Sequence, residues 1–235
     1  MAKKYKREIL IILGLILICC GAFIVESILA GRSSEEVLDK IKQSEVVAEK
    51  IDRIKATEEV EEAALVIPID FDAAWQINED AIAWIKIPNT TVDYPILQSP
   101  DEDNYYSDHD IEKIQHWIPG SIYINLNNSP DLSDRNTIIY GHNVHVLSGD
   151  GTGTMFGDLV KYYEEEFFQK NKEIIIYTPQ NKLSYEIFAA VTYNNKSIPD
   201  LYDLDTREGH QDFLQSIYNT NMKTDLYSDK EVGGR

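Results

Sequence analysis

From about residue 71 onward, the sequence is a series of short runs rich in Ile, Val, Tyr and Thr, each closed by Asn, Asp, Gly or Pro. Such runs are typical of β-strands separated by turns. We expect strands at residues 82–87, 92–97, 120–125, 137–140, 173–178 and 183–192, and helices at residues 72–78, 155–168 and 208–219. Strands and helices do not alternate regularly, which argues against a doubly wound parallel sheet. The pattern predicts a mostly β fold, a closed or partly closed antiparallel barrel with an N-terminal helix and further appended helices.

Charge and cysteine content narrow the function classes. Acidic residues outnumber basic ones 40 to 22, for a formal net charge of −18. That balance argues against nucleic acid as a partner and favours basic or amine-bearing partners. The two cysteines, Cys19 and Cys20, are adjacent. They cannot form a disulfide framework or a cysteine-based zinc site, and residues 21–235 contain no cysteine nucleophile.

The N-terminus has the features of a membrane anchor. Four basic residues within residues 3–7 precede an uncharged run at residues 9–25. As a helix this run would be about 26 Å long, at the short end for a bilayer core of about 30 Å. We expect a cytoplasmic tail at residues 1–8, a transmembrane signal anchor at residues 9–30, and a single-pass cell-membrane protein with its remaining part outside. A signal peptide cleaved near residues 27–31, or lipidation at Cys19 or Cys20, is the alternative.

A helical stalk is expected at residues 33–66, followed by the β-rich domain at residues 70–235. Ser33 and Glu36 form a capping box, and apolar residues recur at helical spacing up to about residue 62 without Gly or Pro. Pro68 follows, and the residue before a proline avoids helical geometry. The pattern predicts one helix, which serves as a spacer and packs on the domain.

His142 is the strongest candidate for chemistry. The predicted strand at residues 137–140 ends at Gly141, and His142 comes next. Histidine titrates near neutral pH and can act as an acid or a base. Taken alone, a histidine at a strand end more often has a structural role.

The segment around His142 resembles the histidine motif of sortases, the cysteine transpeptidases of Gram-positive cell walls. It reads Thr-Ile-Ile-Tyr-Gly-His-Asn, at residues 137–143. The resemblance extends to residues 83–90, 93–98, 103–106, 120–124, 153–159 and 177–179. The Tyr-Pro-Ile-Leu-Gln stretch at residues 94–98, the stalk and the late helix are similar to class B. Together the matches span roughly residues 71–219.

The resemblance implies an activity and its partners. Sortases use a histidine as acid and base, a cysteine in a Thr-Leu-x-Thr-Cys strand as nucleophile, and an arginine that stabilises the oxyanion. The cysteine attacks a sorting-signal peptide of a surface protein, here LPxTG-like or NPxTN-like, and an amine of the peptidoglycan precursor releases the acyl-enzyme. His142 maps onto the family histidine, and we expect no cofactor.

The family cysteine and arginine have no counterpart in this sequence. Arg135 and Arg207 precede the position of the missing strand, and Arg235 has no matching context. We therefore expect a class B sortase that lacks its last strands and is inactive as this chain. A non-catalytic peptide-binding module of the cell surface, or a truncated gene product or incomplete record, is the alternative. A barrel without its last strands has open edges, so we also expect low stability.

Three further motifs suggest ligands, but each has a simpler reading. His142 and His145 are three residues apart, but no further ligands stand at metal-site spacing. Residues 101–112 have the length of a calcium loop, yet Tyr105 and Tyr106 occupy positions where a ligand and the turn glycine are needed. The glycine-rich residues 149–153 lack the P-loop lysine. We expect no metal and no bound phosphate.

Overall fold

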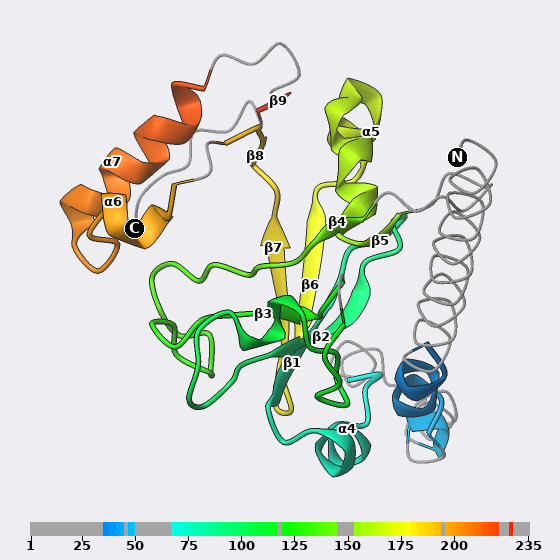
Figure 1. The fold of residues 1–235 in the computed structure, drawn as a ribbon. Helices are drawn as coiled ribbons and strands as arrows, with labels where there is room; N and C mark the ends of the chain where they lie inside the picture. The colour runs from blue at the N-terminus through cyan, green and yellow to red at the C-terminus, as the bar shows by residue number, and fades with distance from the viewer. Residues whose placement is uncertain are drawn as a thin grey trace, which may run out of the picture. The chain divides into compact units, whose positions relative to one another are not determined.

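The computed structural model describes residues 35–44, 47–49, 67–116, 119–144, 153–193, 196–220 and 226–227 (Figure 1). Its contacts divide the chain into two units, Met1–Lys40 and Ile41–Arg235. The described residues of the first unit, 35–40, are helical. The described strands all belong to the second unit. The four predicted domain boundaries stay a prediction.

The second unit is built on a five-stranded sheet, whose strands run side by side in Figure 1. Its order is β3-β2-β1-β6-β7. The strands are β1 (Ala81–Lys86), β2 (Asp93–Leu97), β3 (Ile122–Tyr123), β6 (Glu173–Tyr177) and β7 (Lys182–Glu186). Two small two-stranded sheets accompany it, one of β4 (Asn143–Val144) with β5 (Thr154–Met155) and one of β8 (Ala189–Ala190) with β9 (Leu226–Tyr227).

The predicted mostly β class is confirmed, with one difference in strand direction. Three of the four pairings in the main sheet are antiparallel, but β2 and β3 run parallel, with Ile96 opposite Ile122. A parallel pair needs a long crossover, and residues 98–121 supply it. Within the described ranges these strands form an open sheet and not a closed barrel.

The hydrophobic core packs against the middle of this sheet. Ile85 of β1 stands opposite Tyr94 of β2 and Ile176 of β6, so one row of side chains crosses three strands. The buried cluster comprises Ala83, Ile85, Ile87, Val92, Ile96, Ile122, Ile124, Tyr162, Phe168 and Ile176. In contrast, β7 at the sheet edge has four exposed residues of five. The edge strand therefore contributes little to the core.

Most predicted strands are found, but two are altered. Residues 137–140 do not form a strand, because only Tyr140 bridges β3, at Tyr123. The predicted strand at residues 183–192 is divided into β7 and β8. The division falls at Ile187, whose N–H donates to the carbonyl of Lys172, 2.7 Å away.

The helices begin at capping residues that the sequence displays. The helix α4 (Phe71–Ile77) follows Asp70, whose side chain accepts from the N–H of Ala73 at 3.0 Å. The helix α7 (Arg207–Tyr218) follows Thr206, which accepts from the N–H of Gly209 at 3.1 Å. Both agree with the predicted helices. The others are η1 (Tyr105–Ser107), η2 (Gly157–Tyr163), α5 (Glu165–Lys170) and α6 (Ile198–Leu201). The predicted helix at residues 155–168 is thus a 3-10 turn and an α-helix, separated at Glu164.

The prediction of one continuous stalk helix is wrong at residues 43 and 44. Residues 35–42 are helical, and helix resumes at residues 47–49. Ser44 causes the break, because its Oγ accepts from the N–H of Val47 at 3.3 Å and its carbonyl accepts from Ala48 at 3.1 Å. Serine caps a new helix by offering its side chain to free backbone N–H groups. Residues 33, 34 and 50–66 lie outside the described residues.

The stalk residues of the second unit contact the sheet domain. Ile41 is fully buried, and its carbonyl accepts from the N–H of Asp70 at 3.3 Å. Lys42 Nζ lies 3.7 Å from Asp93 Oδ2 on β2. Ile41 and Lys42 are therefore packed on the domain that follows them.

The prediction of a single-pass membrane localisation is corrected. In the described part of the chain, no helix combines the length and apolar character needed to cross a bilayer. Even α7, with 12 residues, is about 18 Å long, well short of a bilayer core of about 30 Å. The predicted tail and anchor at residues 1–30 lie outside the described residues.

Candidate active site

The backbone that leads to His142 is fixed to the central sheet. Tyr140 and Tyr123 exchange two backbone hydrogen bonds, of 3.0 and 2.8 Å. Their rings are stacked, with centroids 5.4 Å apart. Burial, the charge of Tyr140 and then that of Asp103 raise the pKa of Tyr123 to about 12. The segment two residues before His142 is therefore held at the β3 edge of the sheet.

Gly141 allows a close approach that no other residue would. A Cβ at Gly141 would lie 2.8 Å from Cδ2 of Phe156 and 3.2 Å from Cγ1 of Ile122. The residue after Gly141 is bound to the same segment, because the carbonyl of His142 accepts from the N–H of Phe156 at 2.9 Å. The small sheet of β4 and β5 then continues this pairing. The backbone of His142 is thus tied to two segments distant in sequence.

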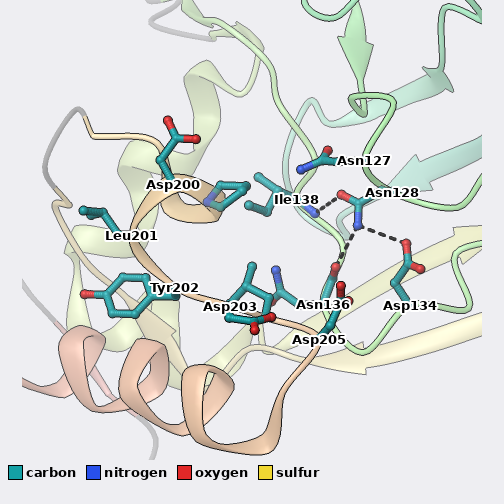
Figure 2. Close-up of a pocket in the computed structure, with 12 residues that line it drawn as sticks. Asn127, Asn128, Asp134, Asn136, Ile138, Asp200, Leu201, Tyr202, Asp203 and Asp205 are labelled. Carbon is teal, nitrogen blue, oxygen red and sulfur yellow. Dashed lines mark hydrogen bonds between the residues drawn. The ribbon is translucent and has the colours of Figure 1, made fainter.

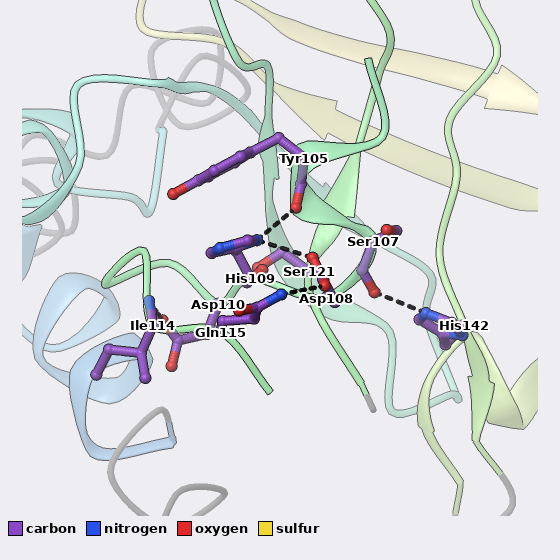
Figure 3. A network of polar contacts seen from close by, with 9 residues as sticks. All are labelled: Tyr105, Ser107, Asp108, His109, Asp110, Ile114, Gln115, Ser121 and His142. Carbon is purple, nitrogen blue, oxygen red and sulfur yellow. Dashed lines mark hydrogen bonds and ion pairs between the residues drawn. The ribbon is translucent and has the colours of Figure 1, made fainter. Parts of the chain in front are cut away.

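The imidazole of His142 is oriented by a main-chain acceptor. Its Nε2 lies 2.7 Å from the carbonyl oxygen of Ser107, at the end of η1 (Figure 3). A carbonyl oxygen can only accept, so Nε2 carries the proton in this contact. In the neutral ring, Nδ1 then holds the lone pair and can accept a proton. This arrangement gives His142 a defined tautomer suited to a general base.

A buried carboxylate holds the loop beside His142. Asp158 is 1% exposed. Its oxygens accept from the N–H groups of Thr91 and Gly153, at 2.9 and 3.2 Å, and from Lys161 Nζ at 2.7 Å. Burial acts to raise the pKa of Asp158, but the bonds from Lys161, Gly153 and Thr91 outweigh it and lower this pKa. Asp158 therefore stays ionised and joins the β1–β2 turn to the segment that contacts His142.

Two carboxylates of the acidic loop at residues 101–112 bind side chains in the loop or just after it. Asp108 accepts from Gln115 Nε2 at 2.8 Å and pairs with His109, also at 2.8 Å. Asp110 pairs with His116 at 2.7 Å (Figure 3 shows the loop). The bond from Gln115 is the main cause that lowers the pKa of Asp108. Over the described ranges, no group of three or more His, Cys, Asp or Glu is arranged to hold a metal ion.

An acidic pocket lies close to Tyr140. It has a volume of about 440 Å³ and is formed by residues 127–138 on one side and 199–205 on the other (Figure 2). Four carboxylates line it, those of Asp134, Asp200, Asp203 and Asp205. Burial raises the pKa of Tyr140, and the charges of Asp103 and then Asp200 raise it further. The pocket is thus electrostatically coupled to a residue two positions before His142.

The other candidates from the sequence are not brought to His142. Arg135 is exposed in the loop before residue 137, and Arg207 is exposed at the first position of α7. Cys19, Cys20, His145 and Arg235 lie outside the described residues. Sequence reasoning missed Ser107 and Asp158. Asp158 belongs to a recognised motif and could have been found there, but a main-chain carbonyl leaves no mark in a sequence.

Comparisons with known proteins identify the family of the chain. A model of the sortase domain matches residues 85–223. A sortase B of Staphylococcus aureus is 28% identical over 230 residues, which is 98% of this chain and 85% of that protein. A sortase B of Listeria monocytogenes is 34% identical over 157 residues, 63% of this chain and 59% of that protein.

Solved structures give the same result for the fold. The structure of a Staphylococcus aureus sortase B–substrate complex is similar to this chain with a TM-score of 0.58 and 25% identity, over 84% of each chain. The family model covers more than half of the present sequence. The chain therefore belongs to the sortase family, and its relatives place it among the class B sortases.

Proposed function

We propose that this domain recognises a sorting-signal peptide of the LPxTG-like or NPxTN-like kind, and that His142 is its general acid and base. The observation that supports this role of His142 is the hydrogen bond from its Nε2 to the Ser107 carbonyl, 2.7 Å long. It leaves Nδ1 of the neutral ring as the proton acceptor. The substrate complex of the similar S. aureus sortase B supports recognition of such a substrate.

In the reaction of class B sortases, one histidine carries out the proton transfers. A thiol passes its proton to the imidazole, and the thiolate attacks the threonine carbonyl carbon, so a C–S bond forms. The amide C–N bond then breaks, and the imidazolium protonates the leaving amine. An amine of the peptidoglycan precursor attacks the thioester, the C–S bond breaks, and the thiol is regenerated. The product joins a surface protein to the cell wall.

This chain supplies the histidine for that reaction, but its two cysteines, Cys19 and Cys20, lie near the N-terminus, far from His142 in the sequence. Residues 21–235 contain no cysteine. We therefore propose that the chain, on its own, binds the signal peptide without forming a thioester.

The charge of the domain supports an amine as the second partner. Four carboxylates line the acidic pocket, those of Asp134, Asp200, Asp203 and Asp205. The charge of one of them, Asp200, contributes to the raised pKa of Tyr140. An acidic lining attracts an ammonium group and repels a carboxylate. A peptidoglycan precursor with a free amine meets that requirement.

Binding and cleavage can be tested separately with the purified 235-residue chain. Fluorescent peptides with an LPxTG or an NPxTN core, and a scrambled control, would be followed by anisotropy and by mass spectrometry. We expect saturable binding of one core, no cleavage, and no mass increase of the chain. Absence of binding to both cores would overturn the recognition proposal, whereas cleavage by the chain alone would overturn the proposed inactivity. His142→Ala is expected to leave binding within about fivefold, because loss of one neutral contact costs about 0.5–1 kcal/mol.

A further inference from the structure

A buried tyrosine lies directly beside the carbonyl that orients His142. Tyr106 is 1% exposed and precedes Ser107 in η1. Its hydroxyl donates to Asp80 Oδ2 at 2.5 Å and accepts from Asn78 Nδ2 at 2.8 Å. The ring is therefore fixed at its far end by the connection between α4 and β1.

This connection is itself rigid. Asn78 is the C-cap of α4, and its Oδ1 accepts from the N–H of Asp80 at 3.0 Å. Asp80 also pairs with Lys113 Nζ at 2.9 Å, and its side chain is only 7% exposed. Buried polar groups that are fully hydrogen-bonded specify one arrangement, because any other leaves a partner unsatisfied.

The backbone of η1 is held from the opposite side. The carbonyl of Tyr106 accepts from Ser121 N–H at 2.8 Å, and the carbonyl of Ser107 accepts from Gly120 N–H at 3.2 Å. A Cβ at Gly120 would lie 2.2 Å from the Tyr106 oxygen, so the two backbones are in close contact. The Ser107 carbonyl can thus accept from His142 in one direction only.

We propose that Tyr106 is a positioning residue for His142, acting through its hydroxyl bonds to Asp80 and Asn78 and through the Ser107 carbonyl. The ring bonds fix the turn η1, and the turn fixes the acceptor that selects the Nε2-protonated tautomer. A positioning residue of this kind acts without touching substrate. The inference rests on the proposed role of His142, but it concerns the state of the imidazole and can be tested without catalysis.

The test is nitrogen NMR of the full chain labelled with ¹⁵N-histidine, under basic conditions where the imidazoles are neutral. His142→Gln identifies the His142 signals. In the parent chain we expect the Nε2-protonated form to dominate. In Tyr106→Phe, which keeps the ring, we expect the ratio of Nε2- to Nδ1-protonated forms to fall about fivefold, as for loss of one hydrogen bond.

Tyr162→Phe is the matched control. Tyr162 is another buried tyrosine, 3% exposed, and its hydroxyl has no hydrogen-bond partner among the described residues. Its variant should leave the tautomer ratio of His142 unchanged. Asp80→Asn is a milder variant, because an amide oxygen still accepts from Tyr106 while the ion pair with Lys113 is lost. We expect its tautomer ratio to lie between those of the parent and of Tyr106→Phe.

The outcomes separate positioning from general stability. A tautomer ratio that is equal in the parent, Tyr106→Phe and Asp80→Asn overturns the inference, even if stability falls. If Tyr106→Phe does not fold, the ratio in Asp80→Asn decides the question alone. Peptide-binding results do not enter this test, so a failed recognition proposal and a failed positioning proposal can be told apart.

Discussion

The carboxylate of Asp158 accepts a hydrogen bond of 2.9 Å from the backbone N–H of Thr91, a residue 67 positions earlier in the chain. The same carboxylate holds Gly153 and Lys161. It therefore joins the β1–β2 turn to the segment whose Phe156 N–H bonds the carbonyl of His142. One buried charge connects the central sheet to the backbone of the proposed acid and base.

Asp158→Asn should destabilise the chain strongly. The amide keeps one acceptor oxygen but loses the charge, and its NH₂ faces a backbone N–H that then has no acceptor. We expect the free energy of unfolding to fall by about 2–3 kcal/mol, measured by urea denaturation with tryptophan fluorescence. Glu166→Gln is the control, because the Glu166–Lys170 pair is exposed and should be worth less than about 0.5 kcal/mol. Equal losses in the two variants would contradict this role of Asp158.

Stability should decline in acid because three aspartates with lowered pKa values, Asp108, Asp134 and Asp158, favour folding when ionised. Burial opposes ionisation of Asp158, but its bonds lower the pKa below 3.8, and the Ser129 N–H is the main cause that lowers the pKa of Asp134. A lowered folded-state pKa gives stability that is present above the unfolded value and is lost as the pH falls through the folded one. We expect urea midpoints to be level near neutral pH and to fall below about pH 5.

The Asp158→Asn variant tests the origin of that pH dependence. Since it removes one of the three aspartates with a lowered pKa, its urea midpoint should fall less steeply with acid than that of the parent chain. A variant that keeps the full pH dependence would show that Asp158 is not among its sources.

Gly141→Ala should disturb the site through Phe156. The added Cβ would lie 2.8 Å from the Phe156 ring, and overpacking of this kind costs about 1–3 kcal/mol. Thermal denaturation followed by circular dichroism would measure the loss. Adding Phe156→Leu makes room for the Cβ, so the double variant should lose less than the sum of the two single variants. Strict additivity would show that the predicted clash does not occur.

Tyr162→Phe should leave stability unchanged or raise it by up to about 1 kcal/mol, because it removes a buried hydroxyl that has no hydrogen-bond partner in the described part of the chain. Burial raises the pKa of Tyr162 to about 12, in keeping with an apolar environment. Urea denaturation of this variant beside Tyr106→Phe provides the comparison, since the hydroxyl of Tyr106 makes two bonds. A loss of more than about 1 kcal/mol in Tyr162→Phe would point to an undetected partner for its hydroxyl.

The sequence by itself determined the fold class and the elements whose signals are local. The helices predicted at residues 72–78 and 208–219 correspond to α4 and α7, and β-rich runs bounded by turn residues marked β1, β2 and β6. The resemblance at residues 137–143 also predicts the sortase family, which the match to the sortase domain confirms. Each of these signals depends on residues close together in the chain, so a linear reading detects it.

Tertiary structure alone decided how the site is held. Ser107 meets His142 across 35 residues, and Asp158 meets Thr91 across 67. The acceptor at Ser107 is a backbone carbonyl, which every residue possesses, so no side-chain pattern could point to it. Only the folding of η1 against Gly120 selects that carbonyl from all the others, because packing, and not residue type, fixes its direction.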